Sequence, residues 1–317
     1  MIRLLVTGAS GFLGRNVLLQ APRDWDIVAV YHDALDFPEF VAIEGLQNVR
    51  VVRCDLTNAS DVSALRATAG QTGPVDAALY LAANGDPAAS ARDPLRDLQL
   101  NTVALLTFLE HCPVPRLVYL SSGAVYDGLS GIVTPASRVE PRLPYSISKL
   151  ASEEYIRFYA DRRGAPASVV NVRFFGAFGP YEPLRKITTR FLTAVNRGDR
   201  EFTLRGDGRN LIDFMYVDDA VRGLLTLVTD DRPVRATIDF ASGQPTSVND
   251  VVNAMVRLTG SDMQIRRDGH SEEYIEFRSG DRRLADDYGF TPQVPFDAGF
   301  ERLRAFIATH GGAAVRG

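Results

Sequence analysis

An α/β fold built on a doubly wound parallel sheet is what the sequence predicts, from two observations. Through the first half of the chain, short runs rich in Val, Ile, Leu and Tyr alternate with longer segments of helical character. The short runs are apolar along their whole length, which is typical of strands buried on both faces of a parallel sheet. Alternation of such strands with helices indicates βαβ units.

Six strands are expected, with helical segments between them. The expected strands are residues 2–7, 26–31, 49–53, 76–82, 116–121 and 167–175. The expected helices include residues 12–21, 58–69, 93–111 and 146–162. Thr57 or Asn58 can cap the second helix, because either side chain can accept a hydrogen bond from a free N–H in its first turn.

The pattern changes after residue 175. Two segments, 176–184 and 205–210, are rich in Gly, Pro and polar residues. A helix is expected after a cap at Thr246 or Ser247, with its end at Gly260, and a last helix over residues 297–309. Because no linker is visible, we expect a smaller lobe interwoven with the first domain. The larger domain would hold 1–175 and about 211–243, and the lobe would hold 176–210 and 244–317.

Composition excludes several classes of partner. The chain has 317 residues and a net charge of −4, so we predict neither nucleic acid nor an anionic membrane as a partner. No apolar run approaches 18 residues, so no membrane-spanning helix is expected. Cys54 and Cys112 are the only cysteines, and the first residues resemble no leader sequence. Reduced thiols and a cytoplasmic location are therefore expected.

A glycine pattern at the end of the first strand indicates a binding site for phosphates. Residues 6–16, VTGASGFLGRN, place Gly8, Gly11 and Gly14 between a strand and a helix. Glycines let the backbone turn tightly and approach a pyrophosphate, and a helix N-terminus offers free N–H groups and a positive dipole end. The pattern therefore predicts a dinucleotide site at this edge of the sheet.

Lys149 stands out because the chain has only two lysines, Lys149 and Lys186, among 35 Lys and Arg. Tyr145 precedes it by four residues at the start of an expected helix, so both side chains share one helix face. A nearby ammonium favours the phenolate and should lower the pKa of Tyr145 from its ordinary value near ~10. Such a phenol can act as a general acid and base near neutral pH.

Several motifs together resemble the extended short-chain dehydrogenase/reductase family. They are the glycine turn, CDLTN (54–58), LAAN (81–84), VYLSSGAVYDG (118–128), the Tyr145–Lys149 pair and GDGRNLIDFMYVDDAV (206–221). The last motif is similar to the NAD(P)-dependent nucleotide-sugar epimerase/dehydratase branch. The resemblance covers about 300 residues. It implies a Rossmann-like domain and a nucleotide-diphosphate sugar as substrate.

The resemblance also implies roles for individual residues. The catalytic residues would be Ser122, Tyr145 and Lys149. The cofactor would be bound by Gly8, Gly11, Phe12, Leu13, Gly14, Tyr31, His32, Asp33, Asp55, Leu56, Leu81, Ala82, Ala83, Asn101, Tyr145 and Lys149. The substrate would be bound by Asn84, Ser122, Gly176, Arg209 and Arg278, with Arg209 on the diphosphate. No metal site is expected.

The choice between NAD and NADP stays open at this point. Members that bind NAD usually end the second strand with Asp, whereas this chain has Tyr31, followed by His32 and Asp33. Asp33 could still reach a ribose, which favours NAD. Arg15 or His32 could instead lie near the 2′-phosphate of NADP.

Three departures from the family pattern bear on the reaction. The 4,6-dehydratases carry acidic residues directly after the catalytic hydroxyl, whereas Gly123 and Ala124 follow Ser122 here. Gly176 stands where many members have a substrate-binding Asn, which suggests more room for substrate. Near the family's later Arg, the chain offers His270 and Arg278 without a clear match.

Three functional hypotheses follow. The first is an NAD-dependent epimerase acting at C4 through a transient 4-keto sugar. The second is an NADPH-dependent 4-ketoreductase, and the third is a non-catalytic module that senses NAD or NADP. A homodimer joined through the helices 93–111 and 146–162 is also implied by the resemblance.

Overall fold

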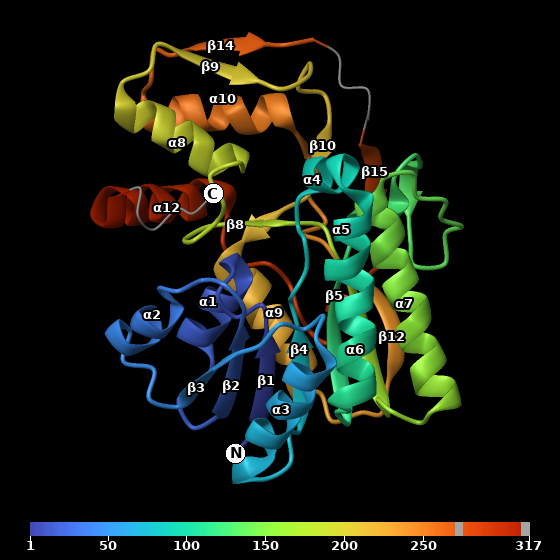
Figure 1. Ribbon diagram of the computed structural model, residues 1–317. Helices are drawn as coiled ribbons and strands as arrows, with labels where there is room; N and C mark the ends of the chain where they lie inside the picture. The colour runs from blue at the N-terminus through green and yellow to red at the C-terminus, as the bar shows by residue number, and fades with distance from the viewer. Residues whose placement is uncertain (270–274, 312–317) are drawn as a thin grey trace.

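A parallel sheet of seven strands forms the larger part of the molecule (Figure 1). The computed structural model describes residues 1–269 and 275–311. The strand order is β12-β7-β5-β4-β1-β2-β3, and each neighbouring pair is parallel. The strands are β1 (Arg3–Thr7), β2 (Asp26–Tyr31), β3 (Val49–Arg53), β4 (Ala77–Tyr80), β5 (Arg116–Ser122), β7 (Ser168–Phe174) and β12 (Arg235–Phe240). The predicted doubly wound sheet is confirmed.

Each central strand sends apolar side chains to both faces of the sheet. In β1, Leu4 and Val6 join one core cluster and Leu5 joins the other, and all three are fully buried. Helices α1 (Phe12–Gln20), α2 (Phe37–Ile43) and α9 (Val217–Thr229) cover the first face. Helices α3 (Ala59–Ala69), α6 (Ala104–His111) and α7 (Pro144–Arg162) cover the second. Burial on both faces explains why the strands are apolar throughout.

The helix caps follow the sequence expectations closely. Asn58 caps α3, because its side chain accepts hydrogen bonds from the backbone N–H groups of Ser60 and Asp61. Ser247 caps α10 (Val248–Thr259), which ends at Gly260 in the left-handed conformation. The last helix, α12, spans Phe296–His310.

The expected helix 93–111 is broken into three pieces. Helix α5 (Pro94–Leu98) leads into a π-helical turn, Gln99–Val103, which is followed by α6. Pro94 stands at the first helical position, and Asp93 caps α5 by accepting a hydrogen bond from the N–H of Arg96. The π turn holds the buried Asn101, and such turns occur frequently at functional sites.

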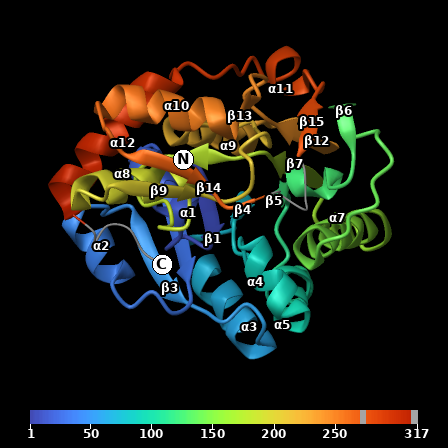
Figure 2. The ribbon, with the colours of Figure 1, turned by 90° about the horizontal axis from the view of Figure 1, so that it is seen from above.

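The smaller lobe lies above the carboxyl ends of the strands in Figure 1. It contains α8 (Ile187–Arg197), α10 and the parallel pair β9 (Glu201–Leu204) and β14 (Gln264–Arg267), with α12 beside them. In the view from above, α8, β9 and β14 of this lobe lie over α1 and β1 (Figure 2).

Short elements connect the two parts of the chain. Strand β8 (Ala177–Phe178) pairs with β11 (Met215–Tyr216), and β15 (Glu276–Ser279) pairs with β6 (Ser130–Val133). The remaining short elements are α4 (Pro87–Arg92), β10 (Leu211–Ile212), β13 (Thr246–Ser247) and α11 (Arg283–Asp286). β15 belongs to the segment expected in the smaller lobe, but it pairs with β6 in the first half of the chain. We therefore propose that the smaller lobe and the larger domain are built from interwoven segments of the chain. No helix in the described ranges is long and apolar enough to cross a membrane.

Candidate active site

The glycine turn between β1 and α1 has no room for larger side chains. Gly8 has a φ of +64°, and a Cβ placed there would lie 2.8 Å from the backbone N of Ala82 on β4's extension. A Cβ on Gly14 would lie 2.5 Å from the carbonyl oxygen of Gly8. The turn is closed by a hydrogen bond of 3.0 Å from the N–H of Gly11 to the carbonyl of Gly8. These contacts bring backbone groups, rather than side chains, to the surface where a phosphate would sit.

A cleft of about 340 Å³ opens beside this turn, where β1, β2, β3 and β4 end. It is lined by Gly8, Ser10, Gly11, Val30, Tyr31, His32, Asp33, Cys54, Asp55, Leu56, Thr57, Leu81, Ala82, Ala83, Arg96, Leu100 and Ala104. Most residues predicted to bind the cofactor therefore meet in one place. Phe12, Leu13 and Gly14 lie behind the turn at the start of α1, and Leu13 belongs to the core.

Replacing Gly8 with Ala is expected to weaken NAD binding by about ten-fold or more, because the methyl group would push the turn off β4. Titration of the purified variant with NAD measures this. Gly45 is the matched control: its φ is +61°, but nothing lies within 4 Å of a Cβ placed there. Gly45→Ala should cost about 1 kcal/mol of folding free energy and leave NAD affinity unchanged. Equal NAD affinities in the two variants would contradict the expectation.

The mouth of this cleft carries acidic groups. Asp33 is exposed, and its carboxylate lies 3.4 Å from Nδ1 of His32, whose Nε2 lies 3.8 Å from Asp55. Arg15, which the sequence placed near a possible 2′-phosphate, is buried instead. Its guanidinium pairs with Asp36 at 2.8 Å and stacks 4.4 Å from the centre of the Phe40 ring. Arg15 is thus held inside the fold, which removes one argument for NADP.

The three predicted catalytic residues come from two elements. Ser122 ends β5, and its Oγ accepts a hydrogen bond of 3.1 Å from the N–H of Ala124. Tyr145 is the second residue of α7, and its backbone N–H donates to Ser90 Oγ. Lys149 follows one turn later, and its Nζ lies 6.0 Å from the Tyr145 ring centre. The side chain of Ser122 lies close enough to Tyr145 to influence its pKa, so the end of β5 and the start of α7 come together at these residues.

The prediction that the pKa of Tyr145 is lowered is wrong for this structure. Burial raises the pKa of Tyr145, and the hydrogen bond from Ser122 and the charge of Arg185 only partly offset this. Lys149 is buried too, and burial lowers its pKa to about 8. Its Nζ donates a hydrogen bond of 2.8 Å to the carbonyl of Leu120, which holds the ammonium group against β5.

A buried carboxylate that the sequence analysis missed lies close to this trio. Asp97 on α5 is 1% exposed, and its charge raises the pKa of Tyr145. It accepts hydrogen bonds from Asn84, Asn101 and Ser148. The sequence around Asp97 gives no sign of a functional role. Only its contact with Ser148 on α7, seen in the structure, points to one.

Two predicted binding residues turn out to be part of this buried network. Asn84 donates from Nδ2 to Asp97, and its Oδ1 accepts from the N–H of Asp86. Asn101 accepts from the N–H of Asn84 at 2.7 Å and is 1% exposed. Both residues therefore hold the segment after β4 against the start of α7.

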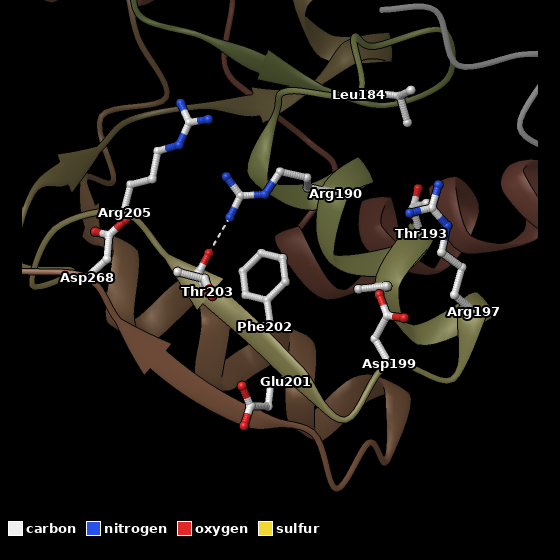
Figure 3. A pocket seen from close by; sticks show the side chains of 11 residues that line it. Leu184, Arg190, Thr193, Arg197, Asp199, Glu201, Phe202, Thr203, Arg205 and Asp268 are labelled. Carbon is white, nitrogen blue, oxygen red and sulfur yellow. Dashed lines mark hydrogen bonds between the residues drawn. The ribbon is translucent and has the colours of Figure 1, made fainter.

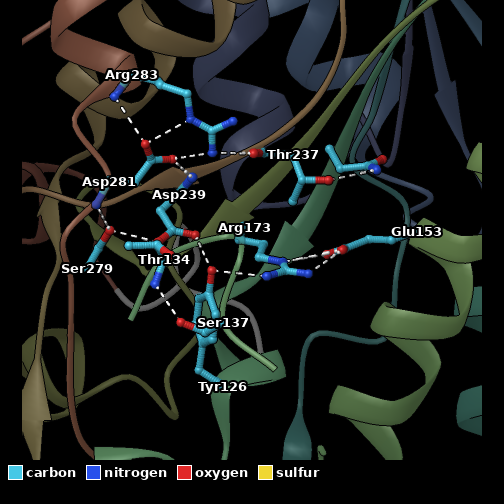
Figure 4. Close-up of polar contacts among 11 residues, drawn as sticks. Tyr126, Thr134, Ser137, Glu153, Arg173, Thr237, Asp239, Ser279, Asp281 and Arg283 are labelled. Atoms are coloured by element: carbon cyan, nitrogen blue, oxygen red, sulfur yellow. Dashed lines mark hydrogen bonds and ion pairs between the residues drawn. The ribbon is translucent and has the colours of Figure 1, made fainter. Parts of the chain in front are cut away.

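A second buried network supports α7 from behind (Figure 4). Arg173 on β7 pairs with Glu153 on α7 at 2.8 Å, and its Nη1 donates to the hydroxyl of Tyr126. Tyr126 in turn donates to Asp239 on β12, which also accepts from Ser279 on β15. Burial raises the pKa of Asp239 to about 6. The network joins α7, β7, β12 and β15, and it reaches β5 because Ser121 also donates to Glu153.

The other residues expected to bind the substrate lie in different parts of the molecule. Arg209 is 78% exposed and faces Asp207 in its own turn, at 3.6 Å. Arg278 is exposed on β15. A Cβ on Gly176 would lie 3.2 Å from the Cβ of Phe214, so the space expected there is filled by that side chain. His270 lies outside the described residues.

Instead, three cations line a cleft between the two lobes. This cleft of about 490 Å³ is bounded by Gly85, Asp86, Pro87, Ala88, Ala91, Leu143, Arg185, Lys186 and Arg205. Arg185 donates a hydrogen bond of 2.7 Å to the carbonyl of Gly85, which ties the lobes together. Lys186 directly precedes α8. It is the second lysine of the chain, a signal that the sequence offered.

A neighbouring cavity in the smaller lobe continues this surface (Figure 3). It measures about 460 Å³, and Arg205 lines both cavities. Arg190 on α8 donates to the carbonyl of Thr203 at 2.5 Å, and Arg205 follows β9, so the two guanidinium groups lie on the same cavity. Within the described ranges, no group of three or more His, Cys, Asp or Glu side chains could hold a metal ion.

Known proteins with a similar sequence or structure share this architecture. The dTDP-glucose 4,6-dehydratase of Streptomyces griseus is 30% identical, over 97% of this chain and 94% of that protein. The structure of MoeE5 in complex with UDP-glucose and NAD is 26% identical, with a TM-score of 0.85, covering 96% of this chain and 98% of that one. The UDP-glucuronic acid 4-epimerase of Bacillus cereus, 22% identical, shares the fold with a TM-score of 0.86, over 96% and 99% of the two chains.

A family model settles the classification. The model described as the NAD dependent epimerase/dehydratase family matches residues 4–240, three quarters of the chain, including the glycine turn, Ser122, Tyr145 and Lys149. The resemblance drawn from the motifs is thereby confirmed, and with it NAD as the cofactor. The chain belongs to the NAD dependent epimerase/dehydratase family, the extended short-chain dehydrogenase/reductase enzymes that act on nucleotide sugars.

Proposed function

We propose that this enzyme is a nucleotide-sugar epimerase that inverts the configuration at C4 of the sugar. The observation that carries the proposal is the meeting of Ser122, Tyr145 and Lys149, with no acidic side chain directly after Ser122. The glycine turn and the cleft beside it fit the pyrophosphate and adenosine of NAD, because a Cβ on Gly8 or Gly14 would collide with backbone there.

NAD, when bound, supplies the acceptor and donor of a hydride. Tyr145 would take the proton of the C4 hydroxyl as the phenolate and later return it as the phenol, which is a general acid–base role. Ser122 would donate a hydrogen bond to the same oxygen and hold it against Tyr145. Lys149, fixed by the carbonyl of Leu120, would keep a positive charge near the phenol when the proton leaves. The 4-keto sugar would then turn over before the proton returns.

The alternative within the family is a 4,6-dehydratase, which the relative from Streptomyces griseus makes worth testing. Elimination of water needs an acid beside the reacting sugar. Gly123 is packed so that a Cβ there would lie 3.0 Å from the Phe175 ring, and Ala124 offers no acid. Asp97 is not placed to act as this acid, because its two oxygens accept three hydrogen bonds from Asn84, Asn101 and Ser148. These contacts favour epimerisation.

The diphosphate of the substrate fits the cleft between the lobes. Arg185, Lys186 and Arg205 line it, and Arg185 is close enough to Tyr145 to affect its pKa. A nucleotide diphosphate carries negative charge that such donors bind well. The nucleoside would lie in the adjoining cavity, which Arg205 and Arg190 share. In this proposal Arg185, Lys186 and Arg205, rather than Arg209, contact the diphosphate.

The proposal is tested with native protein. Denaturing the protein should release NAD, and incubation with UDP-glucose, UDP-glucuronic acid or dTDP-glucose should yield the C4 epimer by NMR, with no net change in nicotinamide absorbance. Loss of the C6 hydroxyl would show a dehydratase, and consumption of NADPH with a keto sugar would show a reductase. No change in any nucleotide sugar would overturn the proposal.

A matched pair of variants tests the cleft in the same assay. Arg205→Met should raise KM about ten-fold or more, because a charge-assisted hydrogen bond is lost, and should leave kcat nearly unchanged. Arg209→Met is the control, since Arg209 is exposed outside the clefts described here. If only Arg209→Met raised KM, Arg209 and not Arg205 would be the residue that contacts the diphosphate.

A homodimer is part of the same proposal. Exposed apolar side chains gather on neighbouring helices: Leu95, Leu98 and Val103 on residues 94–103, and Ile147, Tyr155 and Phe158 on α7. Such a surface is unusual on a monomer. Light scattering should give twice the mass of one chain, and a single-chain mass would refute the dimer. A cytoplasmic location, supported by the buried free thiols Cys54 and Cys112, can be tested by cell fractionation.

A further inference from the structure

A buried carboxylate links the cofactor side of the site to the catalytic helix. Asp97 Oδ1 accepts hydrogen bonds from Nδ2 of Asn84 at 2.8 Å and from Nδ2 of Asn101 at 3.0 Å. Its Oδ2 accepts one from Ser148 Oγ at 2.7 Å. Ser148 Oγ also lies 3.0 Å from the carbonyl oxygen of Tyr145. One carboxylate therefore holds the segment after β4, the π turn and the start of α7.

Among the residues that the structure describes, no cationic side chain donates a hydrogen bond to Asp97. Its three donors are two neutral amides and a hydroxyl, which stabilise a carboxylate but do not cancel its charge. The other buried carboxylate near Lys149 is Glu153, and that one is paired with Arg173 at 2.8 Å. We therefore expect Asp97 to contribute much of the negative electrostatic potential at Ser122, Tyr145 and Lys149, because it is buried and is not screened by water.

We propose that Asp97 is a positioning residue of the reaction, which fixes the start of α7 through its hydrogen bonds and places a buried carboxylate beside Lys149 and Tyr145. The charged and titratable groups around Lys149 are Asp97 on α5, Glu153 and Tyr145 on α7, and Tyr119 on β5. Around Tyr145 they are Asp97, Lys149 and Arg185. Among these, Asp97 is the negative group that acts on both residues.

The directions of the pKa shifts agree with this role. Burial lowers the pKa of Lys149, and Asp97 counteracts that effect, so the lysine keeps its proton to higher pH. Asp97 also raises the pKa of Tyr145 and so disfavours the phenolate. The charge of Asp97 therefore favours the protonated form of both Lys149 and Tyr145.

The substitution Asp97→Asn removes the charge and can keep every contact. The amide oxygen of the new side chain can accept from Asn84 and Asn101, as Oδ1 does now. The amide nitrogen can donate to Ser148 Oγ, whose hydroxyl proton then points to the carbonyl of Tyr145. The matched control is Glu154→Gln on α7, which removes an exposed carboxylate from the same helix.

The decisive measurement uses the fact that the chain has only two lysines. Protein labelled with ¹³C at the lysine Cε gives two NMR signals, which Lys186→Arg assigns. In the wild type, Lys149 should titrate near pH 8, and in Asp97→Asn at lower pH, while Glu154→Gln should match the wild type. Titration of Lys149 at the same pH in the wild type and in Asp97→Asn would overturn the proposal. If Asp97→Asn does not fold, Asp97→Ser, which also lacks the charge, must show the same shift.

A second readout rests on the proposed function. The acid limb of kcat against pH, which reports loss of the Tyr145 proton, should move to lower pH in Asp97→Asn. A uniform fall in kcat with an unmoved limb would mean that Asp97 is only structural, and would overturn its role at Tyr145. If no nucleotide sugar is turned over, the proposed function fails, and the lysine titration still decides whether Asp97 sets the field at the site.

Discussion

Replacing Tyr145 with phenylalanine is expected to lower kcat by roughly 10²–10⁴-fold, the usual contribution of a positioned general acid–base group. The phenylalanine ring would keep its place at the start of α7, near Ser122. The fold and NAD binding should therefore be preserved. The assay is the interconversion of nucleotide-sugar epimers, followed by NMR, with NAD content measured on the same samples.

The same helix supplies a matched control for this variant. Tyr155 lies ten residues later on α7 and is 45% exposed, so Tyr155→Phe should leave kcat within a factor of two. If Tyr145→Phe retained turnover, proton transfer would have to come from another group, and the mechanism would be wrong. A loss of both turnover and NAD would instead point to misfolding of the start of α7.

The largest effect on stability is expected from Arg173→Met. Removing this guanidinium leaves the Glu153 carboxylate, 4% exposed, without its partner at 2.8 Å. An uncompensated buried charge typically costs 3–5 kcal/mol, so the free energy of unfolding should fall by about that amount. Urea unfolding followed by circular dichroism measures the change.

Two further variants show whether the cause is the unpaired charge. Replacing both residues, as in Glu153→Met with Arg173→Met, should recover part of the loss, because the charge is then absent. Arg157→Met breaks an exposed pair with Glu154 on the same helix and should cost less than about 1 kcal/mol. Equal losses for Arg157→Met and Arg173→Met would show that burial of the pair does not matter.

The sheet was predictable because each strand is a local run with a distinct composition. Periodicity gave six of the seven strands, and it left β12 unassigned because RATIDF mixes polar and apolar residues at the edge of the sheet. Helix α2 was missed for a related reason, since a seven-residue segment gives little periodicity. The split of 93–111 depends on tertiary hydrogen bonds to Asn101, which no local pattern encodes.

The site was predictable where a motif fixes backbone geometry, and not where it depends on distant contacts. Gly8 and Lys149 could be singled out from their neighbours in sequence. The sign of the pKa shift at Tyr145 could not, because it depends on burial and on Asp97, 48 positions earlier. Arg185 and Lys186 were missed because the cleft they line exists only when α4 and the segment before α8 meet.

The position of β12 at the edge of the sheet has a consequence for how the chain folds during its synthesis. Its partner β7 ends at Phe174, and sixty residues, 175–234, are translated before β12 begins. A growing chain therefore carries β7 with an open hydrogen-bonding edge for as long as those residues take to emerge from the ribosome. Translation speed across that interval should influence how much newly made enzyme aggregates.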